Sequence, residues 1–250
     1  MQRMKSQSNL IIGRKPLLEA IQNGKAVDKI YYQTNVTGEL IGDINRIAKE
    51  MNIPIQRVPI QKLDGMTRVN HQGVIGVGAV VEYFRLQDII DDLFAKGISP
   101  QLLWLDGITD VRNIGAIART AKCFGVDAII LTEKGNGAIN EEAVKTSAGA
   151  ILDYTIVREK HTQGVIEILK VNGIQIFASS LEAVKTMDRM NFAEPCAVVM
   201  GSEENGVTEQ VIKACTDTFI IPMSKNFDSL NVSVATGIIG FEMFKQRPQL

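Results

Sequence analysis

The sequence predicts an α/β protein with two domains, of which the second is built on a mostly parallel sheet. Its 250 residues are enough to bury a substantial core. Hydrophobic residues make up 45% of the chain and charged residues 22%, which is typical of a folded globular protein. Apolar runs of strand length alternate with amphipathic helical runs, and this alternation favours a sheet covered by helices on both faces.

Residues 1–82 are predicted to form a small three-layer α/β domain. Pro16 favours a helix start and Gly24 a helix stop, and the apolar residues between them share one helix face. The segments that follow continue the alternation of helix and strand. They predict a helix at 14–23, a strand at 29–33, a helix at 37–52, and strands at 53–59 and 73–81.

Residues 83–99 are predicted to link the domains through one amphipathic helix, and residues 100–250 to form the second domain. Because ligands bind at the carboxyl ends of strands in parallel sheets, we expect the chemistry in the loops that follow these strands. The predicted strands are 102–108, 127–132, 154–157, 174–180, 196–202 and 218–223, and the predicted helices are 116–125, 139–150, 164–173, 208–216 and the segment from 231 onward.

Composition limits the possible classes of function. No apolar run approaches the roughly 20 residues that span a bilayer, so no membrane segment is expected and the cytoplasm is the expected location. Three scattered cysteines, Cys123, Cys196 and Cys215, are expected to be reduced. The two histidines, His71 and His161, have no partner at metal-ligand spacing, so no metal site is expected.

Charge is unevenly distributed along the chain. Residues 1–80 hold 11 Lys and Arg against 6 Asp and Glu, whereas the remainder holds 16 against 22. The basic first part permits an anionic partner there, although a solvated surface with this imbalance is equally common.

Three loops after predicted strands carry polar side chains. The first contains Asn113 and Arg119, the second contains Glu203, and the third contains Ser229 and Asn231. None has the G-x-G-x-x-G of dinucleotide-binding enzymes or the G-x-x-x-x-G-K-[ST] of nucleoside triphosphatases, so both classes are disfavoured. Each loop alone is also compatible with a helix cap or a solvated turn.

Together the loops resemble a known family. The pattern N-x-G-A-I-x-R-T-A, then G-S-E-x-x-G-V, then I-P-M with S-L-N-V-S-V-A is similar to the three motifs of the SpoU (TrmH-type) branch of the SPOUT RNA methyltransferases, over about residues 100–247. The preceding IIGRKPLLEAI and HQGVIGV resemble a substrate-binding domain that is similar to kink-turn-binding ribosomal proteins. The most similar subgroup methylates a guanosine of 23S rRNA.

This resemblance implies a fold, a cofactor and partners. It implies a sheet whose C-terminal part forms a trefoil knot, although general topology rules disfavour knots. It also implies a homodimer, S-adenosylmethionine as methyl donor, and a ribose 2′-hydroxyl of RNA as acceptor, with ribosomal RNA preferred to transfer RNA. No metal is implied.

The resemblance also implies roles for individual residues. The expected catalytic residues are Arg119, Asn113, Glu203, Ser229 and Asn231, and the expected donor-binding residues are Gly201, Ile221, Met223, Leu230 and Ser179. The family's base is the arginine that matches Arg119, but a guanidinium rarely releases its proton, so we expect this residue to bind phosphate and to stabilise the developing oxyanion. Glu204 departs from the family pattern, in which many relatives carry glycine. Charge and position suggest RNA contacts for Arg14, Lys15 and Arg68.

Three alternatives remain open from the sequence. The first is a 2′-O-methyltransferase of transfer RNA. The second is a non-catalytic RNA-binding or ribosome-assembly protein, but the joint presence of all five expected catalytic residues argues against it. The third is a related enzyme that methylates a base, although the S-L-N-V-S-V-A segment favours ribose.

Overall fold

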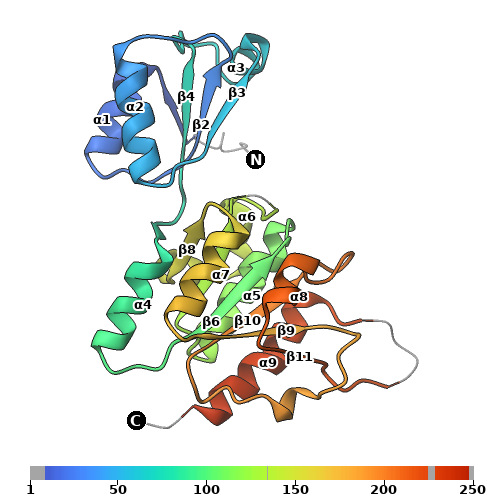
Figure 1. The fold of residues 1–250 in the computed structure, drawn as a ribbon. Helices are drawn as coiled ribbons and strands as arrows, with labels where there is room; N and C mark the ends of the chain where they lie inside the picture. Colours follow the sequence, from blue (N-terminus) through green and yellow to red (C-terminus); the bar gives the residue numbers. More distant parts are fainter. Residues whose placement is uncertain (1–8, 134, 225–228, 248–250) are drawn as a thin grey trace. The chain divides into compact units, whose positions relative to one another are not determined.

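A computed structural model describes residues 9–133, 135–224 and 229–247. The chain forms two compact units, of which the first ends at Val80 and the second begins at Val81 (Figure 1). Each unit has its own buried apolar core.

The first unit is a four-stranded sheet with helices on both faces. Its strands lie in the order β1-β4-β2-β3, with β2 and β3 parallel and the other pairs antiparallel. The elements are β1 (Leu10–Ile12), α1 (Arg14–Gln22), β2 (Val27–Gln33), α2 (Glu39–Glu50), β3 (Ile55–Val58), α3 (Ile60–Met66) and β4 (Val74–Gly78).

Alternation along β2 produces the three layers of this unit. Ile30 and Tyr32 are fully buried in the cluster that includes α1 and α2. Tyr31, between them, packs with Leu63 of α3 in a second cluster, because successive side chains of a strand point to opposite faces. The sequence analysis did not predict β1 or α3, which have only three and seven residues.

The second unit contains a seven-stranded sheet in the order β11-β9-β10-β6-β7-β8-β5, and all of its neighbouring strands are parallel. The strands are β5 (Tyr83–Phe84), β6 (Gln101–Asp106), β7 (Ala128–Thr132), β8 (Ile156–Glu159), β9 (Gln175–Ser179), β10 (Cys196–Gly201) and β11 (Asp217–Phe219). The helices are α4 (Leu86–Ala95), α5 (Val111–Cys123), α6 (Glu141–Thr146), α7 (Thr162–Val171), α8 (Glu209–Ala214) and α9 (Val232–Gln246), with 3₁₀ turns η1 (Ala150–Asp153) and η2 (Met187–Arg189).

Helices cover both faces of this sheet (Figure 1). Leu103 and Leu105 of β6 face the cluster formed with α5, α6 and α9. Leu102 and Trp104 of the same strand face the opposite cluster, formed with α4, α7 and α8. The sheet is therefore buried on both sides, as its uninterrupted apolar strands require.

Two segments differ from the sequence analysis. The expected linker at 83–99 instead belongs to the second unit, since β5 pairs with β8 and α4 buries Leu86 and Ile90 against the sheet. The strand expected at 218–223 ends at Phe219, apart from a single bridge at Ile220. Pro222 lacks the N–H that a longer strand would use.

Candidate active site

The carboxyl ends of β6 and β10 lie at the point where the chain direction across the sheet reverses. From β6 the chain continues through α5 to β7 on one side, whereas β10 and β9 occupy the other side. A crevice forms at such a point in open parallel sheets, and ligands bind there.

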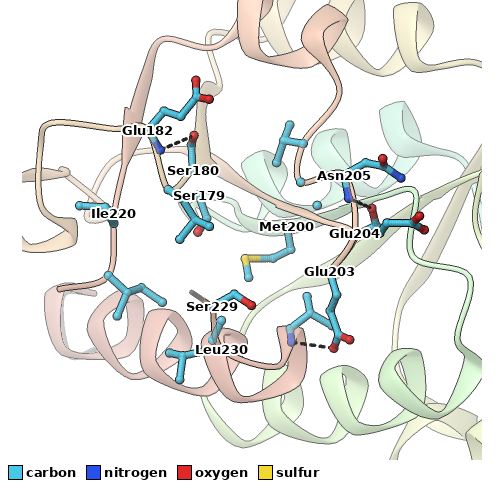
Figure 2. Close-up of a pocket in the computed structure, with 18 of the residues that line it drawn as sticks. Ser179, Ser180, Glu182, Met200, Glu203, Glu204, Asn205, Ile220, Ser229 and Leu230 are labelled. Carbon is cyan, nitrogen blue, oxygen red and sulfur yellow. Dashed lines mark hydrogen bonds between the residues drawn. The ribbon is translucent and has the colours of Figure 1, made fainter. Parts of the chain in front are cut away.

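A pocket of about 610 Å³ opens at this edge (Figure 2). Its volume is within the roughly 300–1,000 Å³ of small-molecule sites. It is lined by the end of β9, the loop after β10, the segment after β11 and the start of α9. Figure 2 shows Met200 in the wall of the pocket, with Ser179, Ile220, Ser229 and Leu230 to its left. All the expected donor-binding residues line this pocket, namely Gly201, Ile221, Met223, Leu230 and Ser179.

The loop after β10 turns back on itself beside the pocket. The amide of Ser202 donates to the Gly206 carbonyl at 3.2 Å, and the amide of Gly206 donates to the Ser202 carbonyl at 2.9 Å. A Cβ on Gly201 would overlap the backbone of Gly206 and Val207. Only glycine at position 201 therefore permits this close return of the backbone.

Charge gives the pocket a preference for cations. Four carboxylates line it, those of Glu182, Glu203, Glu204 and Glu209. Among the described residues that line the pocket, none is a lysine, arginine or histidine. Apolar side chains such as Met200 supply the remaining wall, so the pocket suits a small molecule with a positive charge and an apolar group.

An amide–carboxylate cluster, formed by Asn113, Glu203 and Asn231, lies at the rim of the pocket. Glu203 Oε1 accepts hydrogen bonds from Asn231 Nδ2 at 2.5 Å and from Asn113 Nδ2 at 3.3 Å. Asn231 Nδ2 also donates to Asn113 Oδ1 at 3.2 Å, and the Val232 amide donates to Glu203 Oε1 at 3.4 Å. The cluster thereby joins the starts of α5 and α9 to the loop after β10.

Helix caps fix the two asparagines of the cluster. Asn231 caps α9 by accepting from the Ser233 amide at 2.9 Å. Asp110 caps α5 by accepting from the Arg112 amide at 2.9 Å, and hydrogen bonds from Arg112 hold the pKa of this carboxyl below its usual range. The cap keeps its charge near neutral pH, and an anion at a helix start is favourable.

The structure brings together four of the five expected catalytic residues. Ser229 lines the pocket, and Asn113, Glu203 and Asn231 form the cluster at its rim. Arg119 is exposed on α5, about 9 Å farther along the helix axis than Asn113 at 1.5 Å per residue. Within the described part of the chain, no hydrogen bond or ion pair joins Arg119 to the other four.

The sequence analysis missed Asp106, which ends β6. Its side chain is buried, and it accepts a hydrogen bond from the Thr208 amide at 2.7 Å. This contact anchors the far end of the loop after β10. The signal in the sequence was that Asp106 is a carboxylate at the end of an otherwise apolar strand.

The basic residues Arg14, Lys15 and Arg68 lie in the first unit. Arg14 and Arg68 line a second hollow in that unit, and Lys15, which follows Arg14 in the sequence, is exposed. The pocket of the second unit does not include them.

The sequence predicts no membrane span, no metal site and no disulfide, and the described residues can be examined for each feature. No helix in the described ranges is long and apolar enough to cross a membrane. No group of three or more His, Cys, Asp and Glu among those residues could hold a metal ion. The cysteines are unpaired, and burial raises the pKa of Cys196 to about 12 and that of Cys215 to about 11, so these two thiols stay protonated near neutral pH.

Both units match family models. Residues 100–241 match the model described as the SpoU rRNA Methylase family. Residues 10–84 match the model described as RNA 2′-O ribose methyltransferase substrate binding.

Relatives match over nearly the full chain. A protein of Staphylococcus saprophyticus, named for the TrmH family of tRNA/rRNA methyltransferases, is 33% identical over 238 residues, which cover 95% of this chain and 96% of that protein. A Bacillus subtilis protein named for the same family is 30% identical and covers 98% of both chains.

Solved structures share the fold. The AdoMet-bound rRNA methyltransferase from Sinorhizobium meliloti superposes with a TM-score of 0.59 at 24% identity, covering 94% of this chain and 86% of that one. The TrmH/SpoU tRNA modifying enzyme of A. aeolicus gives a TM-score of 0.53 at 27% identity, covering 64% of this chain and 83% of that one.

Proposed function

Because this chain belongs to the SpoU family of RNA 2′-O-ribose methyltransferases, which use S-adenosylmethionine, we propose that its target is a guanosine of 23S rRNA. The observation that carries the proposal is that the second and third motif loops line one pocket, while Asn113 of the first loop contacts Glu203 at its rim. Its support for ribosomal RNA is that the subgroup which the sequence most resembles has that target. As part of this proposal we place the enzyme in the cytoplasm.

The pocket fits the methyl donor. S-adenosylmethionine carries a methyl group on a positively charged sulfur, and this methyl group is what the bound donor supplies to the ribose oxygen. The carboxylates that line the pocket favour the positive charges of such a donor, and the apolar wall favours its adenine. Backbone near Gly201, Ile221, Met223 and Leu230, together with Ser179, would hold it.

The amide–carboxylate cluster would position the acceptor ribose. Glu203 accepts from both asparagines, so their amides are held in one orientation beside the pocket. Ser229 would shape the boundary between the donor and the ribose. Such fixed positioning contributes much of the rate of a reaction between two substrates.

We assign Arg119 to the substrate phosphate and to the oxyanion that develops as the hydroxyl loses its proton. Its exposure leaves the guanidinium available to RNA. The variant Arg119→Lys separates this role from that of a base. If turnover of the variant is restored at high pH under conditions where chemistry limits the rate, Arg119 acts as the base and our assignment is wrong.

We further propose a homodimer through α9, and the trefoil knot that the family implies. An apolar stripe on α9 supports the dimer. Val234, Ile238, Phe241 and Phe244 are 52%, 36%, 55% and 45% exposed, and they recur at a spacing that places them on one side of the helix. An apolar stripe of this size is unfavourable in water and is typical of an interface.

A methyl-transfer assay tests the proposed target. Purified protein is incubated with S-adenosylmethionine labelled in its methyl group and, separately, with unmodified ribosomal RNA and unmodified transfer RNA. We expect label in 23S rRNA at a guanosine whose 3′ phosphodiester resists alkali, because a 2′-O-methyl group blocks cleavage there. Label only in transfer RNA, or label at an alkali-sensitive position, would contradict the proposal, and no transfer to either RNA would favour the non-catalytic alternative.

A further inference from the structure

A second hollow, of about 620 Å³, lies in the first unit where β2 ends and β4 begins. It is separate from the pocket described above, and it includes Arg14 and Arg68, for which the sequence suggests RNA contacts. Its lining is strongly polar, and it combines two arginines with several amide side chains. The residues that line it are Arg14, Gln33, Ile60, Asp64, Thr67, Arg68, Val69, Asn70, His71, Gln72 and Gly73.

The guanidinium of Arg14 is held in place on one side of the hollow. Its Nε donates to the Gln72 carbonyl and its Nη1 donates to the Thr37 carbonyl, each at 2.9 Å. A Cβ on Gly38 would lie 2.9 Å from Arg14 Nη1, so glycine at that position gives the guanidinium room. A guanidinium has five N–H donors, and these two contacts leave three for a ligand.

The loop from residue 67 to residue 73 forms the other side and is also fixed. His71 is buried, its Nδ1 accepts from the Gly73 amide at 3.0 Å, and its Nε2 therefore donates to Asp64 Oδ1 at 3.0 Å. The Gln72 amide donates to Asn70 Oδ1 at 3.1 Å. Gln72 has a φ of 52°, a conformation that residues other than glycine rarely adopt, and the contacts of this loop hold it there.

The chemistry of the hollow fits one nucleotide. Arg14 and Arg68 supply two positive charges against the single carboxylate of Asp64, which His71 already engages. Arginine forks suit a phosphate, and amide side chains such as that of Asn70 suit the edge of a base. Val69, which is 60% exposed, offers an apolar surface for the face of the base.

A concave site of this kind favours unpaired RNA. The bases of a duplex are stacked and paired, so a duplex cannot place a whole base inside the hollow. An unpaired nucleotide can place its base inside the hollow while its phosphate stays at the arginines. The arginines then bind the phosphate while the amide side chains contact the base.

We propose that this hollow binds one unpaired nucleotide of the substrate RNA, with its phosphate at Arg14 and Arg68 and its base beside Asn70 and Gln72. This inference rests on the proposed function, because it requires an RNA substrate. It assigns the first unit a defined contact point, at which the enzyme recognises an unpaired nucleotide of a loop or bulge.

Binding measurements on the full-length protein test the proposal. The probe is a fluorescent single-stranded RNA of mixed sequence, and its duplex with the complementary strand is measured in parallel. The variants are Arg68→Ala and Asn70→Ala. The matched control is Arg46→Ala, since Arg46 is an exposed arginine of the same unit that lies on α2 and does not line the hollow.

The two variants should differ in salt dependence. We expect Arg68→Ala to weaken binding of the single strand about 5- to 10-fold and to reduce the salt slope by about 0.7, the value for one lost phosphate contact on a single strand. Asn70→Ala should weaken binding about 3- to 10-fold with the slope unchanged, as expected for a lost base contact. Arg46→Ala should bind like the wild type.

Two results would overturn the proposal. One is wild-type affinity of both hollow variants, with their thermal unfolding also unchanged. The other is equal affinity of the wild-type protein for the duplex and the single strand. Methylation kinetics distinguish a wrong nucleotide site from a wrong enzymatic function. If the wild-type protein methylates RNA and both variants have the wild-type KM for RNA, only the proposed nucleotide site is wrong. If the wild-type protein neither binds nor methylates RNA, the proposed function itself is contradicted.

Discussion

Glu203 connects residues that are far apart in the sequence. Its Oε1 atom accepts from Asn113 on α5 and from Asn231 on α9, which are 118 residues apart. A hydrogen bond to a charged group contributes about 1.5–3 kcal/mol, roughly twice the value for a neutral pair. The negative charge of Glu203, and not only its shape, is therefore expected to hold the two amides in register.

The variant Glu203→Gln tests this role. The glutamine carbonyl oxygen can replace Oε1 as acceptor but carries no charge, so the hydrogen bonds from both asparagines should weaken and hold the amides less firmly. We expect kcat to fall about 10- to 100-fold, which corresponds to about 1.4–2.7 kcal/mol. Steady-state kinetics at a saturating concentration of S-adenosylmethionine measure this fall in kcat. The control is Glu204→Gln, because Glu204 lines the same pocket but does not belong to the amide–carboxylate cluster. A Glu203→Gln enzyme with wild-type kcat would contradict the role.

Gly201 limits the path of the backbone beside the pocket. A methyl group in Gly201→Ala would overlap the backbone of Gly206, so the loop after β10 must open. We expect the affinity for S-adenosylmethionine to fall at least about 10-fold, measured by calorimetry. Gly164→Ala is the control, since a Cβ at that position of α7 meets nothing within 4 Å and alanine should stabilise the helix by about 0.5–1 kcal/mol. Equal donor affinity of both variants would show that the close backbone return is unnecessary.

Local motifs in the sequence predicted most of the pocket but not its long-range contacts. The turn at Gly201 and the cap at Asn231 are visible in the sequence because they depend on neighbouring residues. The anchor from Asp106 to Thr208 spans 102 residues and depends on how two strands pair, so no local pattern reveals it. The separation of Arg119 from the cluster is likewise a consequence of helix geometry.

At the scale of elements, α9 is held at both ends. Its start is fixed by the cluster at Glu203, and after its end Arg247 Nη2 donates to Asp127 Oδ2 at 2.5 Å. Asp127 is largely buried and also accepts from the Gln101 amide at 2.7 Å. Burial raises the pKa of Asp127 above its ordinary value in spite of these partners.

The variant Arg247→Ala tests the second anchor. Without Arg247 the buried Asp127 carboxylate loses its counter-charge, and we expect the free energy of unfolding near pH 7 to fall by about 1–3 kcal/mol. An acid whose pKa is raised in the folded state destabilises the fold while it is ionised. As the pH falls toward the pKa of Asp127, this carboxylate becomes protonated and no longer needs a counter-charge. The loss of stability caused by Arg247→Ala should therefore become smaller at lower pH. Urea unfolding at several pH values measures it. The double variant Asp127→Asn/Arg247→Ala should lose this pH dependence, and a loss that grows at lower pH would contradict the account.

Elements whose position depends on tertiary packing differ from those that the sequence predicts. The segment 83–99 is amphipathic, and this pattern is the same for a helix in a linker as for α4 on a sheet. The pairing of β5 with β8 and the burial of Leu86 and Ile90 assign it to the second unit. The short helix α3 contains Gly65, which lowers its intrinsic helix propensity, and packing of Leu63 compensates.

At the scale of the whole molecule, the proposed dimer depends on the apolar stripe of α9. We expect the wild-type protein to have twice the 27.5 kDa mass of one chain in sedimentation experiments. Phe241→Glu places a charge in the centre of the stripe and should shift the mass to that of a monomer. Val171→Glu is the control, because Val171 is 86% exposed at the end of α7, away from α9. A Phe241→Glu protein that stays dimeric would exclude α9 as the interface.

The one tryptophan of the chain, Trp104, is fully buried in the middle of the second unit's sheet. The first unit has no tryptophan, although it contains Tyr31 and Tyr32. Tryptophan fluorescence, excited at wavelengths that tyrosine does not absorb, therefore reports on the core of the second unit. Denaturation followed by this emission reports the second core alone, whereas far-ultraviolet circular dichroism reports both together. If the two curves superimpose, the two cores unfold together in one cooperative transition. If the curves are separated, the stability of each core can be measured in the intact chain, without preparing the units as fragments.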